Sequence, residues 1–217
     1  MRIIVAIDGP AGAGKSTIAK MVSDKFNLMY INTGSMYRAV TLKAMEKDIS
    51  RTDIDNLCKL IDEMNMHFDD NELILNGENI NEKLTMPYIS SNVSNYASIP
   101  EVREKLVHMQ RQMAQKYDVI MDGRDIGTVV LKEAPFKFFL TASPEERAKR
   151  RYKELFEKKI DVNYENLLEE IKRRDYIDSN REVDPLTKAK DAIEIDSTSM
   201  TIEEVVEKIC IHINTKL

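Results

Sequence analysis

The sequence predicts an α/β fold built on a five-stranded, mostly parallel sheet with helices on both faces. Two observations carry this prediction: five short apolar runs are spread along the chain, and segments with helical periodicity separate them. Parallel neighbours need such crossover segments between them. With 217 residues, of which 42% are hydrophobic and 32% charged, the chain is long enough for one well-buried domain.

The first expected strand is RIIVAI, residues 2–7, whose unbroken apolar character is typical of a strand buried on both faces. A glycine-rich loop follows, and a helix is expected over 15–26 because Ile18, Met21 and Val22 recur at helical spacing. The other four strands are expected at residues 28–31, 118–122, 136–141 and 192–196.

Residues 66–80 break this alternation. They hold short strand-like runs separated by Asp-Asp-Asn and Asn-Gly, and Asn-Gly is the strongest short signal for a two-residue hairpin. A small antiparallel insert is therefore expected between the second and third strands of the main sheet. No linker-like segment or internal repeat occurs, so residues 1–217 are expected to form a single domain.

Three later helices carry a start signal, a serine or threonine followed three residues on by glutamate. These pairs are Ser98 and Glu101, Ser143 and Glu146, and Thr201 and Glu204. The last of these helices has an apolar face and is interpreted as a packing helix without a functional role.

The formal net charge of −5 disfavours a nucleic-acid polymer as partner. Basic residues nevertheless gather at 147–153 and 172–181, which favours a small anionic ligand. No run is apolar enough to cross a membrane and no N-terminal targeting pattern is present. The two cysteines, Cys58 and Cys210, have no partner motif, as expected in a reducing cytoplasm, and the three histidines form no metal-binding pattern.

The glycine-rich stretch GPAGAGKST matches the phosphate-binding pattern G-x-x-x-x-G-K-[ST] between a buried strand and a helix. Its backbone N–H groups would surround the phosphates of ATP, Lys15 would reach the β- and γ-phosphates, and the Ser16 hydroxyl would ligate Mg²⁺. A GTPase is disfavoured because no Asn-Lys-x-Asp segment occurs, and the chain is short for a motor ATPase. The predicted ATP-binding residues are Gly9, Pro10, Ala11, Gly12, Ala13, Gly14, Lys15, Ser16 and Thr17.

Two further motifs follow expected strands, NTGSMYRAV at 32–40 and DGRDIGTVV at 122–130. With the phosphate loop and the arginine-rich segments, they make the chain resemble the bacterial cytidylate kinase family over essentially its whole length. The resemblance implies a three-layer P-loop kinase fold with a nucleoside-monophosphate-binding insert at about 62–97 and a helical lid at about 145–181. It also implies transfer of the γ-phosphoryl group of ATP to CMP or dCMP, giving CDP or dCDP and ADP.

The carboxyl ends of parallel strands meet at one edge of a sheet, so the three motifs should meet there. Arg38 and Arg124 are then candidate clamps on an acceptor phosphate. Arg174, Asp178 and Arg181 share one helical face by their spacing, although a solvated, ion-paired stripe would have the same spacing.

The resemblance adds roles for individual residues. It implies that Thr33, Arg174 and Arg181 contact the acceptor, that Asp178 lies near its sugar, and that Ser94, Arg103 and Asp125 touch the cytosine. Arg147, Arg150 and Arg151 resemble the arginines of a mobile lid. Asn32 stands where family members often carry an acid, and Thr33 where serine is common. The residues expected to act in catalysis are Lys15, Arg124, Arg150 and Arg181.

The expected partners are small molecules, ATP with Mg²⁺ and CMP or dCMP, and a monomer is expected. Two alternatives remain open at this stage. One is a kinase for another acceptor, such as UMP, AMP or a shikimate-like alcohol. The other is a regulator or nucleic-acid-associated ATPase that binds ATP without an acceptor.

Overall fold

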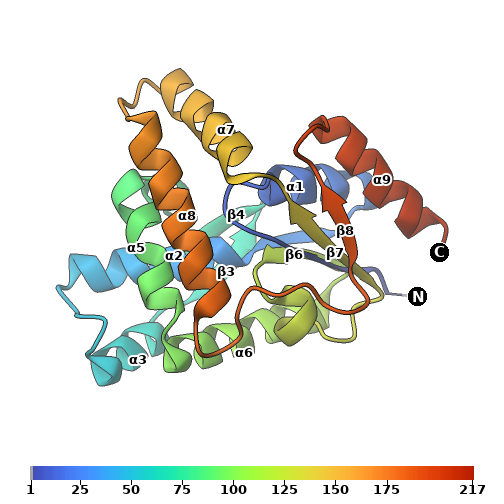
Figure 1. Cartoon of the computed structure of the whole chain (residues 1–217). Helices are drawn as coiled ribbons and strands as arrows, with labels where there is room; N and C mark the ends of the chain where they lie inside the picture. Colours follow the sequence, from blue (N-terminus) through green and yellow to red (C-terminus); the bar gives the residue numbers. More distant parts are fainter. Residues whose placement is uncertain (1) are drawn as a thin grey trace.

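The main sheet is entirely parallel. Figure 1 shows the computed structural model, which describes residues 2–217. Its strands lie in the order β2-β6-β1-β7-β8, and every neighbouring pair is parallel. Their bounds are β1 (Ile4–Asp8), β2 (Met29–Asn32), β6 (Val119–Gly123), β7 (Phe136–Thr141) and β8 (Ile193–Asp196). The predicted fold class is confirmed, and each strand begins within two residues of its expected start.

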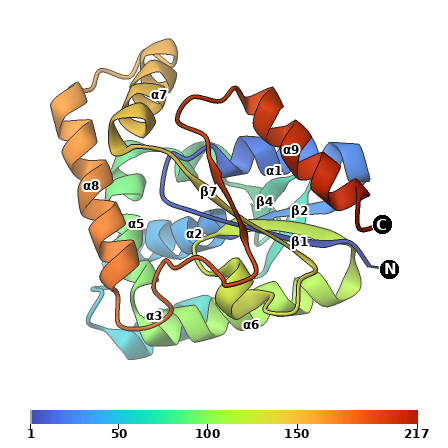
Figure 2. The ribbon, with the colours of Figure 1, turned by 45° about the vertical axis from the view of Figure 1, so that its right-hand side comes forward.

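Helices cover both faces of this sheet because its central strands bury both sets of side chains. In β1, Val5 and Ile7 join the core beneath α1 (Lys15–Phe26) and α9 (Ile202–Asn214). Ala6, between them, joins the core beneath α2 (Thr33–Glu46) and α6 (Pro100–Lys116). Figure 2 shows α1 and α9 on one side of the sheet and α6 on the other. The result is three layers.

The expected antiparallel insert is a three-stranded sheet. After α3 (Ile54–Asp62) come β3 (Met66–Asp69), β4 (Glu72–Leu75) and β5 (Glu78–Asn79). The two-residue turn Asn76-Gly77 has φ angles of 51° and 84°, the left-handed conformation that a tight hairpin turn requires. Then follow α4 (Asn81–Leu84) and α5 (Pro87–Ala97). Leu73 and Leu75 share one core cluster with Ala6 and Ile31 of the main sheet, so the insert packs onto the domain.

A pair of helices, α7 (Pro144–Glu157) and α8 (Tyr164–Asn180), stands at one end of the sheet (Figure 1). In both views α8 lies beside α5, and Arg173 of α8 donates a 2.7 Å hydrogen bond to the Ser91 carbonyl of α5. This helix pair therefore faces the insert across the end of the sheet.

Two of the three predicted helix starts are confirmed. Thr201 forms the complete capping box with Glu204, and Ser143 accepts from the Glu146 N–H. The prediction for Ser98 is wrong: α6 begins after Ile99 without a side-chain cap, and the Ser98 hydroxyl donates to the Asn95 carbonyl of α5 at 3.0 Å. Ser98 is the C-cap of α5, directly after its last residue Ala97, so its hydroxyl bonds back to α5.

Between β6 and β7 the chain forms a π-helix, η1 (Ile126–Val130), which the sequence did not predict. No helix within residues 2–217 combines the length and apolar character that crossing a membrane requires.

The candidate active site

A cleft of about 1280 Å³ opens at the carboxyl ends of the main-sheet strands. Its walls come from the loop after β1, the start of α2, the turn after β6, α5, and the helices α7 and α8. The three motifs that the sequence placed at strand ends therefore do meet at one edge.

The loop after β1 has the backbone that phosphate binding needs. Gly14 caps α1 in the left-handed conformation, φ 86°, so the first N–H groups of α1 face the loop. Gly9 has φ 149°, and a Cβ there would lie 2.0 Å from the Leu140 carbonyl oxygen of β7. The Lys15 ammonium is buried and donates to the Pro10 carbonyl at 2.7 Å. Burial and then the neighbouring Arg124 hold the pKa of Lys15 well below its usual value.

Oxygen ligands suited to Mg²⁺ lie beside this loop. The Ser16 hydroxyl donates to Asp122 Oδ2 at 2.9 Å, and the Tyr30 hydroxyl donates to Asp122 Oδ1 at 3.0 Å. A hydroxyl and a carboxylate fit Mg²⁺, which takes few protein ligands and completes its shell with phosphates and water. Asp122 was missed as a site residue by the sequence analysis; its signal is an acid at the end of a strand next to β1. Residues 2–217 contain no cluster of three or more His, Cys, Asp or Glu that could hold a metal alone.

Asn32, the departure from the family pattern, has a structural task. Its side-chain oxygen accepts from the Ser35 N–H at 3.0 Å and caps α2. Asparagine caps a helix as well as aspartate does, so the loss of a charge leaves the start of α2 intact. Thr33 is buried and its hydroxyl donates to the Asp122 carbonyl at 2.7 Å, which joins α2 to the end of β6.

Three arginines, Arg38, Arg124 and Arg174, gather in the cleft and are called the arginine cluster below. Arg174 is buried, and its Nε has no hydrogen-bond partner among the described residues. Burial, and then the charges of Arg174 and Arg124, lower the pKa of Arg38 to about 9. Arg174 is buried and Arg38 and Arg124 are half-buried, and like charges held together in this way without enough counter-ions form a site prepared for an anion.

Asp178 supplies the arginine cluster with one carboxylate. It accepts from Arg124 Nε at 2.8 Å and from the Ser94 hydroxyl at 3.1 Å. Burial raises the pKa of Asp178, but the nearby arginines outweigh burial and hold it below its usual value, so the carboxylate is ionised at neutral pH.

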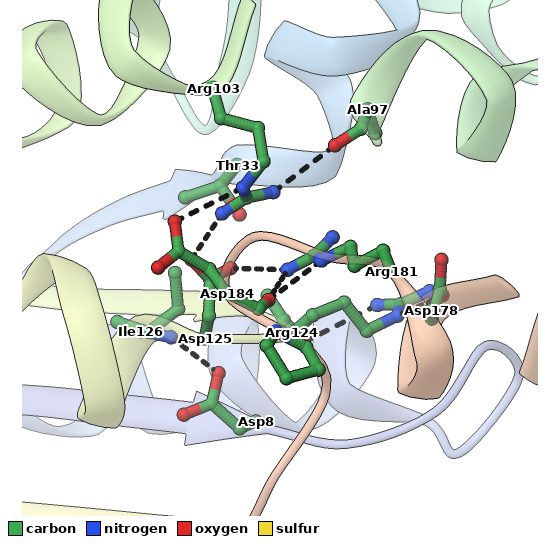
Figure 3. Close-up of polar contacts among 12 residues, drawn as sticks. Asp8, Thr33, Ala97, Arg103, Arg124, Asp125, Ile126, Asp178, Arg181 and Asp184 are labelled. Carbon is green, nitrogen blue, oxygen red and sulfur yellow. Dashed lines mark hydrogen bonds and ion pairs between the residues drawn. The ribbon is translucent and has the colours of Figure 1, made fainter. Parts of the chain in front are cut away.

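Next to the arginine cluster lie Arg103, Asp125, Arg181 and Asp184, called the charge quartet below (Figure 3). Arg103 is only 1% exposed although it lies in the first turn of α6. It is ion-paired with Asp125 and donates from Nε to Asp184 Oδ2 at 3.2 Å. Arg181 follows the end of α8 in extended conformation, so it leaves the helical face predicted for it, and its Nη2 still lies 3.3 Å from Asp125 Oδ1.

Two buried residues that the sequence analysis missed support the charge quartet. The Tyr37 ring lies under the Arg103 guanidinium, 5.6 Å from centroid to Cζ, and its hydroxyl has no partner among the described residues. Asp8 accepts 2.7 Å hydrogen bonds from the N–H groups of Ile126 and Gly127, and so fixes the turn that carries Asp125. Burial raises the pKa of Asp8 to about 6.

The three lid arginines lie in different surroundings. Arg150 lines the cleft but donates to the Ser197 carbonyl at 2.6 Å, in the loop after β8. Arg151 is near enough to the arginine cluster to lower the pKa of Arg38 and Arg174. Arg147 is buried, and it donates to the Ala11 carbonyl and to both oxygens of Asp175, so a role on lid closure stays a prediction for it.

A phosphate loop, a Mg²⁺-compatible Ser–Asp pair and a second anion site on one parallel sheet define a P-loop kinase. A solved shikimate kinase from Bacteroides thetaiotaomicron shares the fold, with a TM-score of 0.53, 13% identity and 99% of both chains covered. The family model for cytidylate kinase matches residues 5–215, so the chain belongs to the cytidylate kinase family. A cytidylate kinase of Clostridium perfringens is 72% identical over 207 residues, 95% of each chain. One of Clostridium acetobutylicum is 64% identical over all 217 residues of this chain and 100% of its own.

Proposed function

We propose that this protein transfers the γ-phosphoryl group of ATP to CMP or dCMP, giving ADP and CDP or dCDP. One observation carries the proposal: the phosphate loop, the arginine cluster, and Arg103, Asp125 and Arg181 of the charge quartet all line one cleft. ATP would occupy the first, the acceptor phosphate the second, and the acceptor base the third. Family membership supports this assignment.

Catalysis of this reaction depends on the alignment of the reactants and on charge neutralisation more than on proton transfer. An oxygen of the acceptor phosphate forms a bond to the γ-phosphorus, while the bond to the oxygen bridging the β- and γ-phosphorus breaks. That acceptor oxygen is already anionic near neutral pH, so no general base is required. Phosphoryl transfer of this kind depends on alignment and on neutralising charge.

Each part of the cleft has a task in that scheme. Lys15 would exchange the Pro10 carbonyl for phosphate oxygens of ATP, and the arginine cluster would hold the acceptor phosphate. Mg²⁺ bound at Ser16 and Asp122 would neutralise charge on the phosphates of ATP. Asp178 would accept from a sugar hydroxyl, and its neighbour Ser94 would contact the base.

Base selection follows from the charge quartet. Cytosine offers an amine donor beside two acceptors, whereas uracil has a carbonyl in place of the amine and a donor at N3. Asp125 would accept from the amine and Arg103 would donate to the ring acceptors. With uracil, the carbonyl oxygen would face the Asp125 carboxylate and the N3–H would face the Arg103 guanidinium. Such mismatches in an enclosed site discriminate by roughly 10⁴.

The insert at 62–97 and the helix pair at 145–181 would close on the two nucleotides, and Arg150 and Arg151 would move with α7. Arg150 stays a predicted catalytic residue. To reach the phosphates on closure, its guanidinium would have to give up the hydrogen bond to the Ser197 carbonyl. A monomer in the cytoplasm completes the proposal.

An ADP-release assay with CMP, dCMP, UMP, AMP and shikimate as acceptors tests the proposal. CMP and dCMP should be the best acceptors, and Lys15→Ala should lose nearly all turnover. Lys25→Ala, an exposed lysine in the last turn of the same helix, is the matched control and should keep it. Faster turnover with AMP or shikimate than with CMP would contradict the proposal.

A further inference from the structure

Asp184 occupies a strained position beside the proposed base site. It lies in the segment between α8 and β8, and its φ is 50° although it is not glycine. It also precedes Pro185, and a residue before proline favours an extended backbone. Such a conformation persists only where surrounding contacts over-determine it, and these positions concentrate at functional sites.

Within residues 2–217, the hydrogen bonds that Asp184 accepts come from the two arginines of the charge quartet. Its carboxylate accepts from Arg103 Nε at 3.2 Å, and its backbone carbonyl accepts from Arg181 Nε at 2.7 Å and from Arg181 Nη2. Figure 3 shows Asp184 and Asp125 facing both guanidinium groups. One residue therefore orients two arginines, one through its side chain and the other through its backbone.

The hydrogen bonds of Arg103 leave two of its N–H groups available for a ligand. A guanidinium has five N–H donors. Asp184 takes the one on Nε, Asp125 takes one on Nη2, and the Ala97 carbonyl takes one on Nη1 at 3.3 Å. One hydrogen on each Nη nitrogen remains for a ligand. The oxygen and ring nitrogen of cytosine are two adjacent acceptors of this kind.

Without Asp184 the arrangement would change. Arg103 could then turn so that both Nε and Nη2 bind Asp125, because a two-point arginine–carboxylate pair is the strong geometry. The carboxylate oxygen of Asp125 that would accept from the amine of the base would then be occupied by Arg103. Two guanidinium groups would also face one carboxylate in a site where Arg103 is 1% exposed.

We propose that Asp184 is a positioning residue for base selection: by holding Arg103 Nε, it keeps Arg103 and Asp125 aimed at a cytosine ring. This inference rests on the proposed function. The side chain of Asp184 is 27% exposed and lies in a connecting segment, so its replacement should leave the folded domain intact.

The test compares Asp184→Ala and Asp184→Asn with Glu182→Gln, which neutralises an exposed carboxylate two residues earlier in the same segment. Asp184→Ala should raise KM for CMP about tenfold, the scale of losing a charge-assisted hydrogen bond at a buried group. At saturating CMP, kcat should stay within about twofold, KM for ATP should not change, and kcat/KM for UMP should fall much less. Asp184→Asn should lie between, because its amide oxygen still accepts from Nε.

Three results would overturn the inference. One is an equal fall of kcat/KM for CMP and UMP in Asp184→Ala, another is a CMP defect of the same size in Glu182→Gln, and the third is a kcat/KM for CMP that Asp184→Ala leaves unchanged. Thermal melting of each variant separates unfolding from lost selectivity. If the unaltered enzyme failed to use CMP, the proposed function would fail together with this inference, whereas any of these three results in an enzyme that uses CMP would overturn the inference alone.

Discussion

Single arginines in the cleft have opposite effects on stability and on binding. Burial and mutual repulsion lower the pKa of Arg38 and Arg174, which means that the folded state disfavours their charged forms. An unfolded chain hydrates the same groups freely. The ligand-free fold therefore carries an electrostatic cost that an incoming phosphate removes, so the same charges that weaken the fold give the site its affinity.

Arg38→Gln should consequently make the ligand-free protein more stable. The expected gain is about 1 kcal/mol, or about 2–4 °C in Tm for a chain of this size. The same variant should bind CMP at least tenfold more weakly, because an arginine–phosphate contact is lost. Thermal melting with and without CMP measures both effects, with Arg51→Gln, an exposed arginine outside the cleft, as control. A lower Tm without ligand would contradict the idea of a repulsive cluster.

Asp125→Ala should reduce activity on CMP much more than activity on UMP. The variant loses the acceptor for the cytosine amine, while uracil loses only an unfavourable acceptor–acceptor contact. Values of kcat/KM for both substrates decide the matter. An equal loss for both would mean that Asp125 serves mainly to hold Arg103 and Arg181, and that base selection lies elsewhere in the cleft.

At the scale of the element, α7 and α8 are joined to the phosphate loop by one buried side chain. Arg147 donates to the Ala142 carbonyl at the end of β7, to the Ala11 carbonyl of the loop, and to Asp175 of α8, the last at 3.0 and 2.5 Å. A Cβ on Gly12 would lie 3.2 Å from Arg147 Cβ, so the loop rests directly on α7. The position of the helix pair is therefore coupled to the shape of the loop.

Arg147→Lys should raise KM for ATP about tenfold and change KM for CMP little. Lysine keeps the charge but cannot bind two carbonyls and a carboxylate in the forked geometry of arginine. Asp175→Asn should act in the same direction, and Glu169→Gln on the exposed face of α8 is the control. Initial rates with each substrate varied in turn give the answer, and an unchanged KM for ATP in a folded Arg147→Lys enzyme would count against the coupling.

The helix pair should also close when both nucleotides bind. Arg151 donates to the Thr85 carbonyl of the insert at 3.5 Å, and Arg174 Nε has no hydrogen-bond partner in the part of the chain that the structure describes. Hydrogen exchange in α7 and α8 should slow with CMP plus a non-hydrolysable ATP analogue, while α3, which contributes no residue to the cleft, should be unaffected. Protection confined to the phosphate loop would show that these helices are not a lid.

At the scale of the whole molecule, sequence predicted the sheet better than the site. Strands buried on both faces are continuous apolar runs, so β1 and β6 were visible within two residues. Arg103 has the same sequence surroundings as a surface arginine, because its ion-pair partners come from the turn after β6 and the segment after α8, both distant in sequence. The family resemblance placed it where residue patterns could not.

Residues without a motif were missed altogether. Asp8 accepts from a backbone N–H that lies 118 residues away, and Asp184 accepts from an arginine that lies 81 residues away. No periodicity or spacing encodes such a contact, since it exists only after the sheet has assembled. The prediction that Ser98 caps α6 failed for a local reason instead. Two helices meet there, and its one hydroxyl hydrogen-bonds to α5 and so does not cap α6.

The central place of β1 in the sheet also determines when the sheet can form during synthesis of the chain. Both neighbours of β1 are made late: Ile4 pairs with Val119 and Val5 with Phe136. At roughly 5–20 residues per second, β1 therefore waits roughly 5–20 seconds after its synthesis for its first partner. Throughout that wait both edges of β1 lack a partner strand, and the phosphate loop has no sheet to hold it. Unpaired strand edges on a growing chain can pair with other chains, so late synthesis of its neighbours exposes β1 to aggregation.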